Sequence, residues 1–347
     1  MVEVNSFVRL GPAFTFFLVF SLLGVVMVVV SGGLLGVYVG FECAFLGIVA
    51  VLAGESVEEN ESCMKYYIFQ ALGSIYMLVG FVSLVEPVIS LYWSWGFVML
   101  GVCLKAGFFP FHYWVPSVLA TCSWFSCFLV TVWQKVGLMC FIGKWGASYE
   151  LTWLLEVVAC ATALLGGIGG IGVVFYRTLI GYSSLVHSGW MILASLLGVY
   201  GVMFYIFVYS MVSGSLMYRL YCSKVMCFED FSNLNHRGSE QFFLIFVDFL
   251  SLAGIPTLPG FLPKCVVLVM VGMTYPLSLF LLIFSSLLSL FYYLKVALIA
   301  GVGSGANGYL FISSMKKPYC WLLNTLFRWN SFFYLISLVG LAVIIFY

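Results

Sequence analysis

The sequence predicts an all-α fold, a polytopic transmembrane helix bundle of about eleven helices that includes broken helices. The chain is 64% hydrophobic and only 8% charged, whereas soluble domains are about 25% charged. Several apolar runs reach the roughly 17 to 25 residues that cross a hydrocarbon core of about 30 Å. A transmembrane β-barrel would show short alternating segments instead. We therefore expect residues 1–347 to form a single transmembrane domain.

Apolar runs between polar loops define the expected helices in order. The first run follows a terminus with a single basic residue, Arg9, and no evident cleavage site, so we expect it to be retained as a helix. The run at 240–272 is too long for one simple crossing and contains GIPTLPGFLP, which predicts a broken helix. The expected spans are 12–31, 33–53, 64–85, 91–109, 118–144, 150–172, 176–197, 199–222, 240–272, 274–300 and 330–347.

Basic residues in the loops and near the ends of the expected spans predict the orientation of the bundle. Eleven crossings place the two termini on opposite sides of the membrane, and Lys144 is then the one basic residue assigned to the side of the C-terminus. The positive-inside rule makes the side of the N-terminus the matrix-like or cytoplasm-like side. The basic residues assigned to that side are Arg9, Lys65, Arg177, Arg219, Lys224, Arg237, Lys316, Lys317 and Arg328.

Charged residues also lie inside the expected spans. Lys135 is the single charged residue in the run from Leu119 to Gly143. Insertion scales assign about 2.5 to 3.5 kcal/mol to a mid-helix Lys or Asp, so five such charges represent on the order of 10 kcal/mol. A cost of this size favours a functional role, and the alternative is that each charge pairs with a neighbour to hold helices together. The charges are Glu42, Lys105, Lys135, Asp248 and Lys264, with His112 and His187 in or near apolar stretches.

The residue types in this set suit a proton relay. Burial disfavours the charged form of a lysine and a nearby carboxylate favours it, so moving the carboxylate switches a lysine between holding and releasing a proton. Histidine, with an ordinary pKa near 6.5, accepts and donates protons near neutral pH. Broken helices add backbone groups that are tolerated inside a membrane where they line a hydrated cavity.

Several other patterns receive structural interpretations. GIGGIG at 167–172 matches GxGxxG but follows no strand, so close helix packing explains it better than nucleotide binding. The pairs Cys122/Cys127 and Cys222/Cys227 lack the spacing of zinc or redox sites. The net charge of +1 indicates no nucleic-acid partner. We expect no metal, nicotinamide, flavin, iron–sulfur or quinone site in this chain.

Five motifs resemble, in the same order, those of the mitochondrial NADH-ubiquinone oxidoreductase chain 2 family. Together they cover the chain from about Gly40 to Lys295. The motifs are KYYIFQALGS at 65–74, LKAGFFPFHYWVPSV at 104–118, VWQKVG at 132–137, RTLIGYSSLVHSGWM at 177–191 and GIPTLPGFLPK at 254–264.

The resemblance implies an antiporter-like membrane subunit of respiratory complex I, the proton-translocating NADH:ubiquinone reductase. It implies a multi-pass protein of the mitochondrial inner membrane, with the N-terminus in the matrix and the C-terminus in the intermembrane space. Its partners would be the lipid bilayer and other complex I subunits, especially neighbouring antiporter-like ones. NADH, FMN, iron–sulfur clusters and ubiquinone would be bound in partner subunits, and this chain itself would carry out no redox chemistry.

The resemblance also assigns roles to the buried charges. Glu42 resembles a glutamate that pairs with the lysine of the next functional helix, here Lys105. Lys135 resembles the central lysine and Lys264 the lysine of the distal half-channel. His187 resembles a histidine that bridges these two lysines through water.

Four positions are less well assigned. His112 matches a family histidine whose role is left open, and Asp248 matches no family motif, so a local lysine or donor is expected to pair with it. Ser117 stands where the family commonly has glutamate. Leu138 stands where a proline commonly follows the central lysine, so a helix break at Gly137 is less secure.

Two alternative functions share much of this pattern. A sodium/proton antiporter subunit that works without electron transfer would carry a similar set of buried lysine and glutamate. A structural scaffold would use the buried charges only to align helices against partner subunits.

Overall fold

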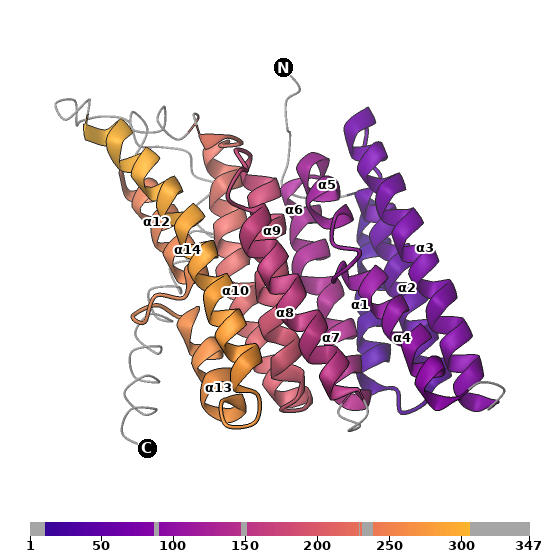
Figure 1. Ribbon diagram of the computed structural model, residues 1–347. Helices are drawn as coiled ribbons and strands as arrows, with labels where there is room; N and C mark the ends of the chain where they lie inside the picture. Colours follow the sequence, from indigo (N-terminus) through magenta and orange to yellow (C-terminus); the bar gives the residue numbers. More distant parts are fainter. Residues whose placement is uncertain (1–10, 87–89, 147–150, 229, 231–238, 306–347) are drawn as a thin grey trace.

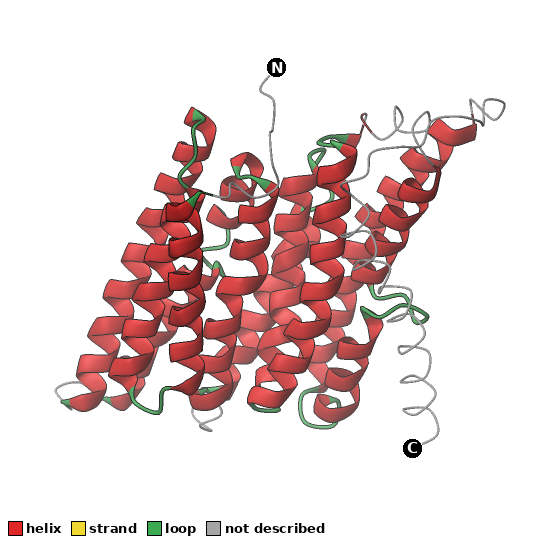
Figure 2. Ribbon diagram, turned by 180° about the vertical axis from the view of Figure 1, so that it is seen from behind, coloured by secondary structure: helices red, strands yellow, loops and turns green. Residues whose placement is uncertain are grey.

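The computed structural model is a bundle of long helices packed side by side (Figure 1), and no strand occurs among the residues it describes (Figure 2). These residues are 11–86, 90–146, 151–228, 230 and 239–305. In chain order the helices are α1 (Pro12–Val30), α2 (Leu34–Leu52), α3 (Val57–Val85), α4 (Leu91–Ala106), α5 (Trp114–Thr121), α6 (Trp124–Phe128), α7 (Gln134–Trp145), α8 (Thr152–Gly169), α9 (Tyr176–Ser195), α10 (Val199–Ser223), α12 (Ser239–Ala253), α13 (Phe261–Val271) and α14 (Pro276–Gly305).

The predicted membrane-spanning fold class is confirmed. Seven helical segments of the described chain are long and apolar enough to cross a membrane. They are α1, α2, α3, the continuous segment Trp124–Trp145, α8, α10 and residues 276–296 of α14. Each expected span that falls on described residues contains a helix, and the expected span 330–347 lies outside those residues.

Helix α3 begins seven residues before the expected start at residue 64. Ser56 caps its first turn, because its hydroxyl accepts a hydrogen bond from the Glu59 backbone N–H at 3.2 Å. The negative charges of Glu58 and Glu59 in this turn interact favourably with the positive end of the helix dipole. The charged residues between 57 and 64 therefore form the polar first turns of α3 rather than a loop.

The expected helix 118–144 is divided in the structure. Helix α5 ends at Thr121, and a new helix begins at Trp124 after Ser123, whose hydroxyl caps it. This second helix continues to Trp145 and passes through Gly137 and Leu138 without a break. Leu138 supplies the backbone N–H that a proline would lack.

Two other helices are interrupted. Helix α4 ends at Gly107, which adopts a left-handed conformation with φ 72°, and α5 starts only at Trp114. The broken helix predicted at 240–272 is confirmed, because residues 254–260 separate α12 from α13 and Gly254 has φ 85°. At both sites the carbonyl groups of a helix end lie inside the bundle.

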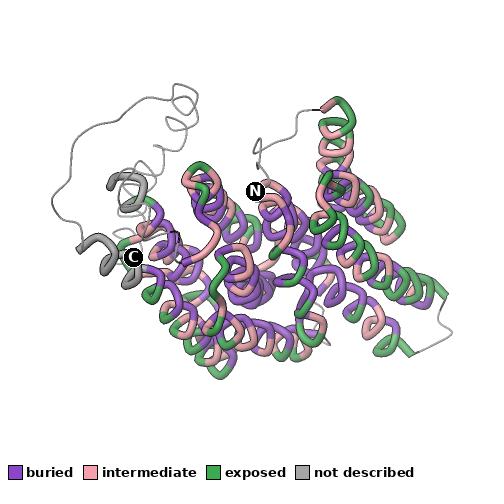
Figure 3. Tube along the Cα trace, turned by 90° about the horizontal axis from the view of Figure 1, so that it is seen from above, coloured by how far each residue is buried: buried purple, intermediate pink, exposed green. Residues whose placement is uncertain are grey.

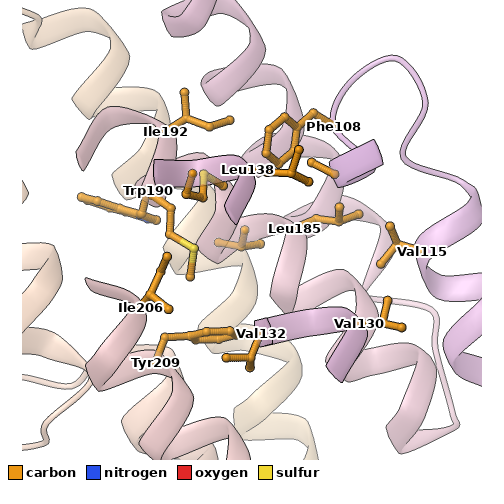
Figure 4. Close-up of a cluster of buried hydrophobic side chains, with 14 of the residues drawn as sticks. Phe108, Val115, Val130, Val132, Leu138, Leu185, Trp190, Ile192, Ile206 and Tyr209 are labelled. Carbon is orange, nitrogen blue, oxygen red and sulfur yellow. The ribbon is translucent and has the colours of Figure 1, made fainter. Parts of the chain in front are cut away.

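Buried residues gather toward the middle of the bundle and exposed residues toward its periphery (Figure 3). Many of the exposed residues are large and apolar, as expected against lipid. Part of the core gathers Val115 of α5, Leu138 of α7, Leu185 and Trp190 of α9, and Ile206 of α10 (Figure 4). This apolar packing encloses the interrupted helices.

Helices α1 and α2 approach closely at glycine residues. A Cβ atom placed on Gly24 would lie 2.8 Å from the Gly40 carbonyl oxygen, and one on Gly47 would lie 2.7 Å from the Phe17 carbonyl oxygen. Real Cβ contacts are longer, so the two backbones depend on these glycines, as is common for small residues between membrane helices.

We predict that Gly24→Ala separates α1 from α2 and lowers the amount of folded protein. Gly96→Ala is the matched control, because a Cβ atom there would have no neighbour within 4 Å. Both changes also improve intrinsic helix propensity by about 1 kcal/mol, so only the steric effect differs. Membrane abundance and the thermal unfolding temperature in detergent measure the outcome. Equal behaviour of the two variants would contradict the close approach.

Candidate functional site

Lys105 and Glu42 form an ion pair between α4 and α2. The Lys105 Nζ atom lies 3.0 Å from Glu42 Oε1, and the lysine side chain is 2% exposed whereas that of Glu42 is 27% exposed. Lys105 lies in the last turn of α4, where the helix dipole favours a positive charge. Phe41 and Phe45 of α2 flank the ammonium group at 5.6 and 5.9 Å from their ring centres.

Helix α3 supports Lys105 from the other side. The Gln70 side-chain Nε2 donates to the Lys105 carbonyl oxygen at 2.8 Å, which satisfies a carbonyl at the interrupted end of α4. A Cβ atom on Gly73 would lie 2.6 Å from Lys105 Cγ, so this glycine makes room for the lysine stem. The KYYIFQALGS motif therefore acts by holding Lys105 in place.

A small internal cavity of about 10 Å³ lies beside Lys105. Gln70, Gln134 and Lys105 provide its polar lining, and apolar side chains close the rest. The Gln70 Oε1 atom is buried and has no hydrogen-bond partner among the described residues. A buried water needs roughly this volume and a few polar partners. The cavity therefore suits one water molecule between Lys105 and Gln134, the residue before Lys135.

Lys135 is buried in α7, directly after a π-helical turn formed by residues Leu129–Trp133. Its Nζ atom donates to the Ser184 carbonyl oxygen at 2.8 Å and lies 3.3 Å from the Ser184 hydroxyl. No carboxylate of the described residues lies within ion-pair distance of Lys135. A π-helical turn inserts one residue into a helix and is frequent at functional sites. The irregularity expected at Gly137 thus occurs one turn earlier.

His187 lies in the middle of α9 and is 5% exposed. Its Nδ1 atom lies 3.0 Å from the Tyr205 hydroxyl of α10. The backbone of Leu252, in the last turn of α12, lies close to the ring, and both Lys135 and Lys264 lie within electrostatic reach of it. The histidine therefore stands between the two lysines.

Lys264 lies in the first turn of α13 and reaches back across the interruption to α12. Its Nζ atom donates to the Ala253 carbonyl oxygen at 2.8 Å, so a lysine satisfies the carbonyl end of the preceding half-helix. The ammonium group also lies 6.0 Å from the ring centre of Trp190. A Cβ atom on Gly254 would lie 2.8 Å from Lys264 Nζ, so the lysine needs a glycine there.

The structure therefore brings five of the six candidate residues into one row across the bundle. Helices α2 and α4 both contact α7, α7 contacts α9, and α9 contacts α13. Because these helices run side by side (Figure 1), the row passes from one helix to the next across the bundle. Its members are Glu42, Lys105, Lys135, His187 and Lys264.

His112 is not joined to this row. It lies between α4 and α5, and its ring contacts that of Tyr113 at a tilt of 36° with ring centres 3.9 Å apart. Its Nδ1 atom is buried and has no hydrogen-bond partner among the described residues. The described hydrogen bonds and ion pairs do not link it with the five residues of the row.

Asp248 pairs with an arginine rather than with a lysine. Its Oδ2 atom lies 2.8 Å from Arg219 NH1, and the Ser215 hydroxyl donates to the same oxygen at 3.2 Å. Arg219 was expected near the end of the span 199–222, and it lies inside α10 one turn before the end of that helix. The guanidinium also donates to the Leu244 carbonyl oxygen at 2.8 Å. This pair fastens α10 to α12.

Sequence reasoning missed the groups that orient the charged side chains. Ser184, Tyr205 and Gln70 form the hydrogen bonds that fix Lys135, His187 and the end of α4. Gln70 and Ser184 lie inside the recognised motifs, so their position there was an available signal. Tyr205 lies outside every motif and only the packing of α10 on α9 brings it to His187.

Comparison with known proteins places this geometry in context. The family described as "NADH:quinone oxidoreductase/Mrp antiporter, TM" matches residues 31–289. The NADH-ubiquinone oxidoreductase chain 2 of Mytilus edulis is 36% identical over 254 residues, which are 72% of this chain and 76% of the relative. The chain 2 protein of Anopheles gambiae is 30% identical over 292 residues, 81% of this chain and 84% of the relative.

Solved structures share the fold at lower sequence identity. A chain of respiratory complex I from Thermus thermophilus matches with a TM-score of 0.82 and 21% identity, covering 96% of this chain and 80% of that one. A chain of the archaeal membrane-bound sulfane sulfur reductase matches with a TM-score of 0.77 and 16% identity, covering 98% and 78%. A chain of the Mrp complex from Dietzia matches with a TM-score of 0.60 and 19% identity, covering 81% and 59%.

We predict that Gly254→Ala destabilises the protein by pushing Lys264 away from the Ala253 carbonyl. The positive φ of Gly254 adds a strain of roughly 1–2 kcal/mol for any other residue. The steric part is separated by repeating the change in a Lys264→Ala background, where Gly254→Ala should lower the thermal unfolding temperature less. Losses of equal size in both backgrounds would show that the two residues do not interact.

Proposed function

The chain belongs to the NADH:quinone oxidoreductase/Mrp antiporter family, and we propose that it is a core membrane-arm subunit of respiratory complex I that translocates protons. Electron transfer from NADH to ubiquinone takes place in partner subunits of the complex. The chain is therefore a subunit of the proton-translocating NADH:ubiquinone reductase and contributes ion transport to it. Its relatives from Mytilus edulis and Anopheles gambiae carry the name of this enzyme.

One observation carries the proposal: ionisable side chains form a buried row that crosses the bundle from α2 to α13. An isolated buried charge has a structural explanation, because it can align two helices. A row of three lysines, a histidine and a glutamate on successive contacting helices supports proton transfer, because neighbouring groups exchange protons directly or through one water.

The mechanism begins at the Glu42–Lys105 pair. Glu42 is 27% exposed at the edge of the bundle, whereas Lys105 is enclosed. A displacement in a neighbouring subunit can therefore reach Glu42 and move its carboxylate away from Lys105. The positive charge of Lys105 is then uncompensated in a medium of low dielectric constant, and its field acts strongly on the next charged group.

Lys135 is that next group, and it has no carboxylate partner among the described residues. An increase in the nearby positive potential favours transfer of its proton toward His187 and onward to Lys264. The return of Glu42 to Lys105 reverses the potential, so that Lys135 accepts a new proton. The hydrogen bonds that Lys135 donates to Ser184 and that His187 shares with Tyr205 keep the side chains oriented through this cycle.

The proposed surroundings follow from the same assignment. The chain spans the mitochondrial inner membrane several times and contacts neighbouring antiporter-like subunits of the complex. The N-terminus faces the matrix and the C-terminus the intermembrane space, an orientation supported by the many basic residues near the helix ends on the side of the N-terminus. NADH, FMN, iron–sulfur clusters and ubiquinone bind in the partner subunits, and the described residues contain no group of His, Cys, Asp and Glu suited to a metal ion.

A second candidate is an antiporter subunit that works without electron transfer, because the fold also matches a chain of an Mrp complex. We predict that a native gel of the source membranes, solubilised in mild detergent and stained for NADH oxidation, contains this chain in the active high-mass band. An antibody against the chain measures this. Its absence from the active band, with a signal at lower mass, would support the antiporter instead.

We predict that Lys135→Met leaves the complex assembled and able to oxidise NADH, but lowers the number of protons moved per NADH. Methionine keeps the volume of the stem and removes the transferable proton. Lys144→Met is the control, because Lys144 lies at the far end of the same helix and donates to carbonyls at the end of α1. NADH oxidation and proton uptake are measured together in reconstituted vesicles.

Unchanged proton stoichiometry in Lys135→Met would sink the relay role. If neutral replacement of Glu42 or Lys105 reduced assembly while the assembled fraction pumped normally, the buried charges would be structural, as in a scaffold.

A further inference from the structure

A group of buried tyrosines lies beside the proposed relay and has no role in it so far. Tyr205 and Tyr209 of α10 and Tyr292 and Tyr293 of α14 are each at most 4% exposed. Tyr205 is accounted for by its hydrogen bond to His187. The hydroxyl groups of the other three have no hydrogen-bond partner among the described residues. We call Tyr209, Tyr292 and Tyr293 the tyrosine cluster.

The cluster begins at His187. The ring of Tyr209 lies against the imidazole, with ring centres 4.8 Å apart. The hydroxyl of Tyr293 lies close to the side chains of Tyr292 and Ser183 but has the geometry of a hydrogen bond with neither. The two tyrosine rings of α14 are in contact, with centres 4.6 Å apart. Four hydroxyl groups from three helices thus converge near the histidine.

Apolar packing explains the rings of these residues but not their hydroxyl groups. A buried hydroxyl without a partner costs about 1–3 kcal/mol, and phenylalanine would fill the same space without that cost. Buried polar groups in proteins are paired with other groups or with ordered water. Hydroxyl groups that lie close together without a well-formed hydrogen bond between them are typical partners of a bridging water.

The cluster extends from His187 toward one end of the bundle. Ser183 lies one helical turn, about 6 Å, from His187 in the direction of the start of α9. Tyr293 contacts Phe249, with ring centres 5.7 Å apart, and Phe249 contacts Tyr176, the first residue of α9, at 5.8 Å. We call this the basic end of the bundle.

Charged residues mark the basic end. Arg177 follows Tyr176 in the first turn of α9, and Lys224 caps the last turn of α10 there. The carboxylate of Asp230 accepts hydrogen bonds from the backbone N–H groups of Met226 and Cys227 at 3.0 Å. The cluster therefore lies between the buried histidine and a polar, charged end of the protein.

We propose that the tyrosine cluster and Ser183 bind a short row of water molecules that carries protons between the basic end and His187. This inference rests on the proposed relay and adds an access route to it. A proton moves along the row by transfer from one water to the next and is received by a ring nitrogen of His187. The tyrosines stay neutral and orient the waters through their hydroxyl groups, so they are positioning residues.

The test uses the assembled complex with Tyr293→Phe, which removes one hydroxyl and keeps the ring. The proton uptake per NADH oxidised should fall by about as much as in Lys135→Met, with assembly and packing unchanged. The solvent deuterium isotope effect on NADH oxidation should increase, because proton transfer becomes slower without the hydroxyl. A purely structural role of the hydroxyl would leave the isotope effect unchanged. Ser183→Ala, on another helix, should have the same effects.

Tyr182→Phe is the matched control, because it makes the same chemical change beside Ser183, at a ring that packs against Gly169 outside the cluster. Normal proton uptake and an unchanged isotope effect in both Tyr293→Phe and Ser183→Ala would overturn the access route. Reduced assembly of Tyr293→Phe would also overturn it, since the hydroxyl would then be structural. If Lys135→Met also pumped normally, the relay itself would fail, and this outcome is distinct from failure of the access route alone.

Discussion

The arrangement of this protein depends on the requirement that every backbone carbonyl inside a membrane finds a hydrogen-bond donor. An uninterrupted helix satisfies it internally, but α4 and α12 end inside the bundle and leave carbonyl groups without helical partners. Gln70 supplies the donor at the end of α4, and Lys264 supplies it at the end of α12. At the second break, the ammonium group that completes the backbone is also the one proposed to carry a transferable proton. In that proposal a single nitrogen atom has both a structural and a transport role.

The fold could be predicted from the sequence because a bilayer requires each crossing helix to be long and apolar. Length and hydropathy located each helix of the described chain, and the glycine and proline residues of 254–263 located the interruption between α12 and α13. Boundaries were less accurate where polar residues take part in a helix, as in the capped first turns of α3. The π-helical turn at Leu129–Trp133 was not predictable, because its residues are ordinary helix formers and tertiary packing determines the extra residue.

The candidate site could be predicted in part, for a different reason. Charged residues are conspicuous in an apolar membrane span, so Lys105, Lys135 and Lys264 were identified from the sequence alone. Their uncharged partners are common residue types, and only the packing of helices distant in sequence distinguishes Ser184 or Tyr205 from similar residues elsewhere. The pairing of Asp248 with Arg219 was missed because Asp248 matches no motif, and only the packing of α10 on α12 brings Arg219 to its carboxylate.

The π-helical turn before Lys135 sets the direction in which that lysine points. One residue more in a helix rotates all later side chains by about 100° relative to those before the insertion. Gln134 and Gly137 consequently face the cavity beside Lys105, while Lys135 faces Ser184 on the opposite neighbour. The π-helical turn thus rotates the side chains of α7 about the helix axis relative to those of α6 within one continuous membrane helix.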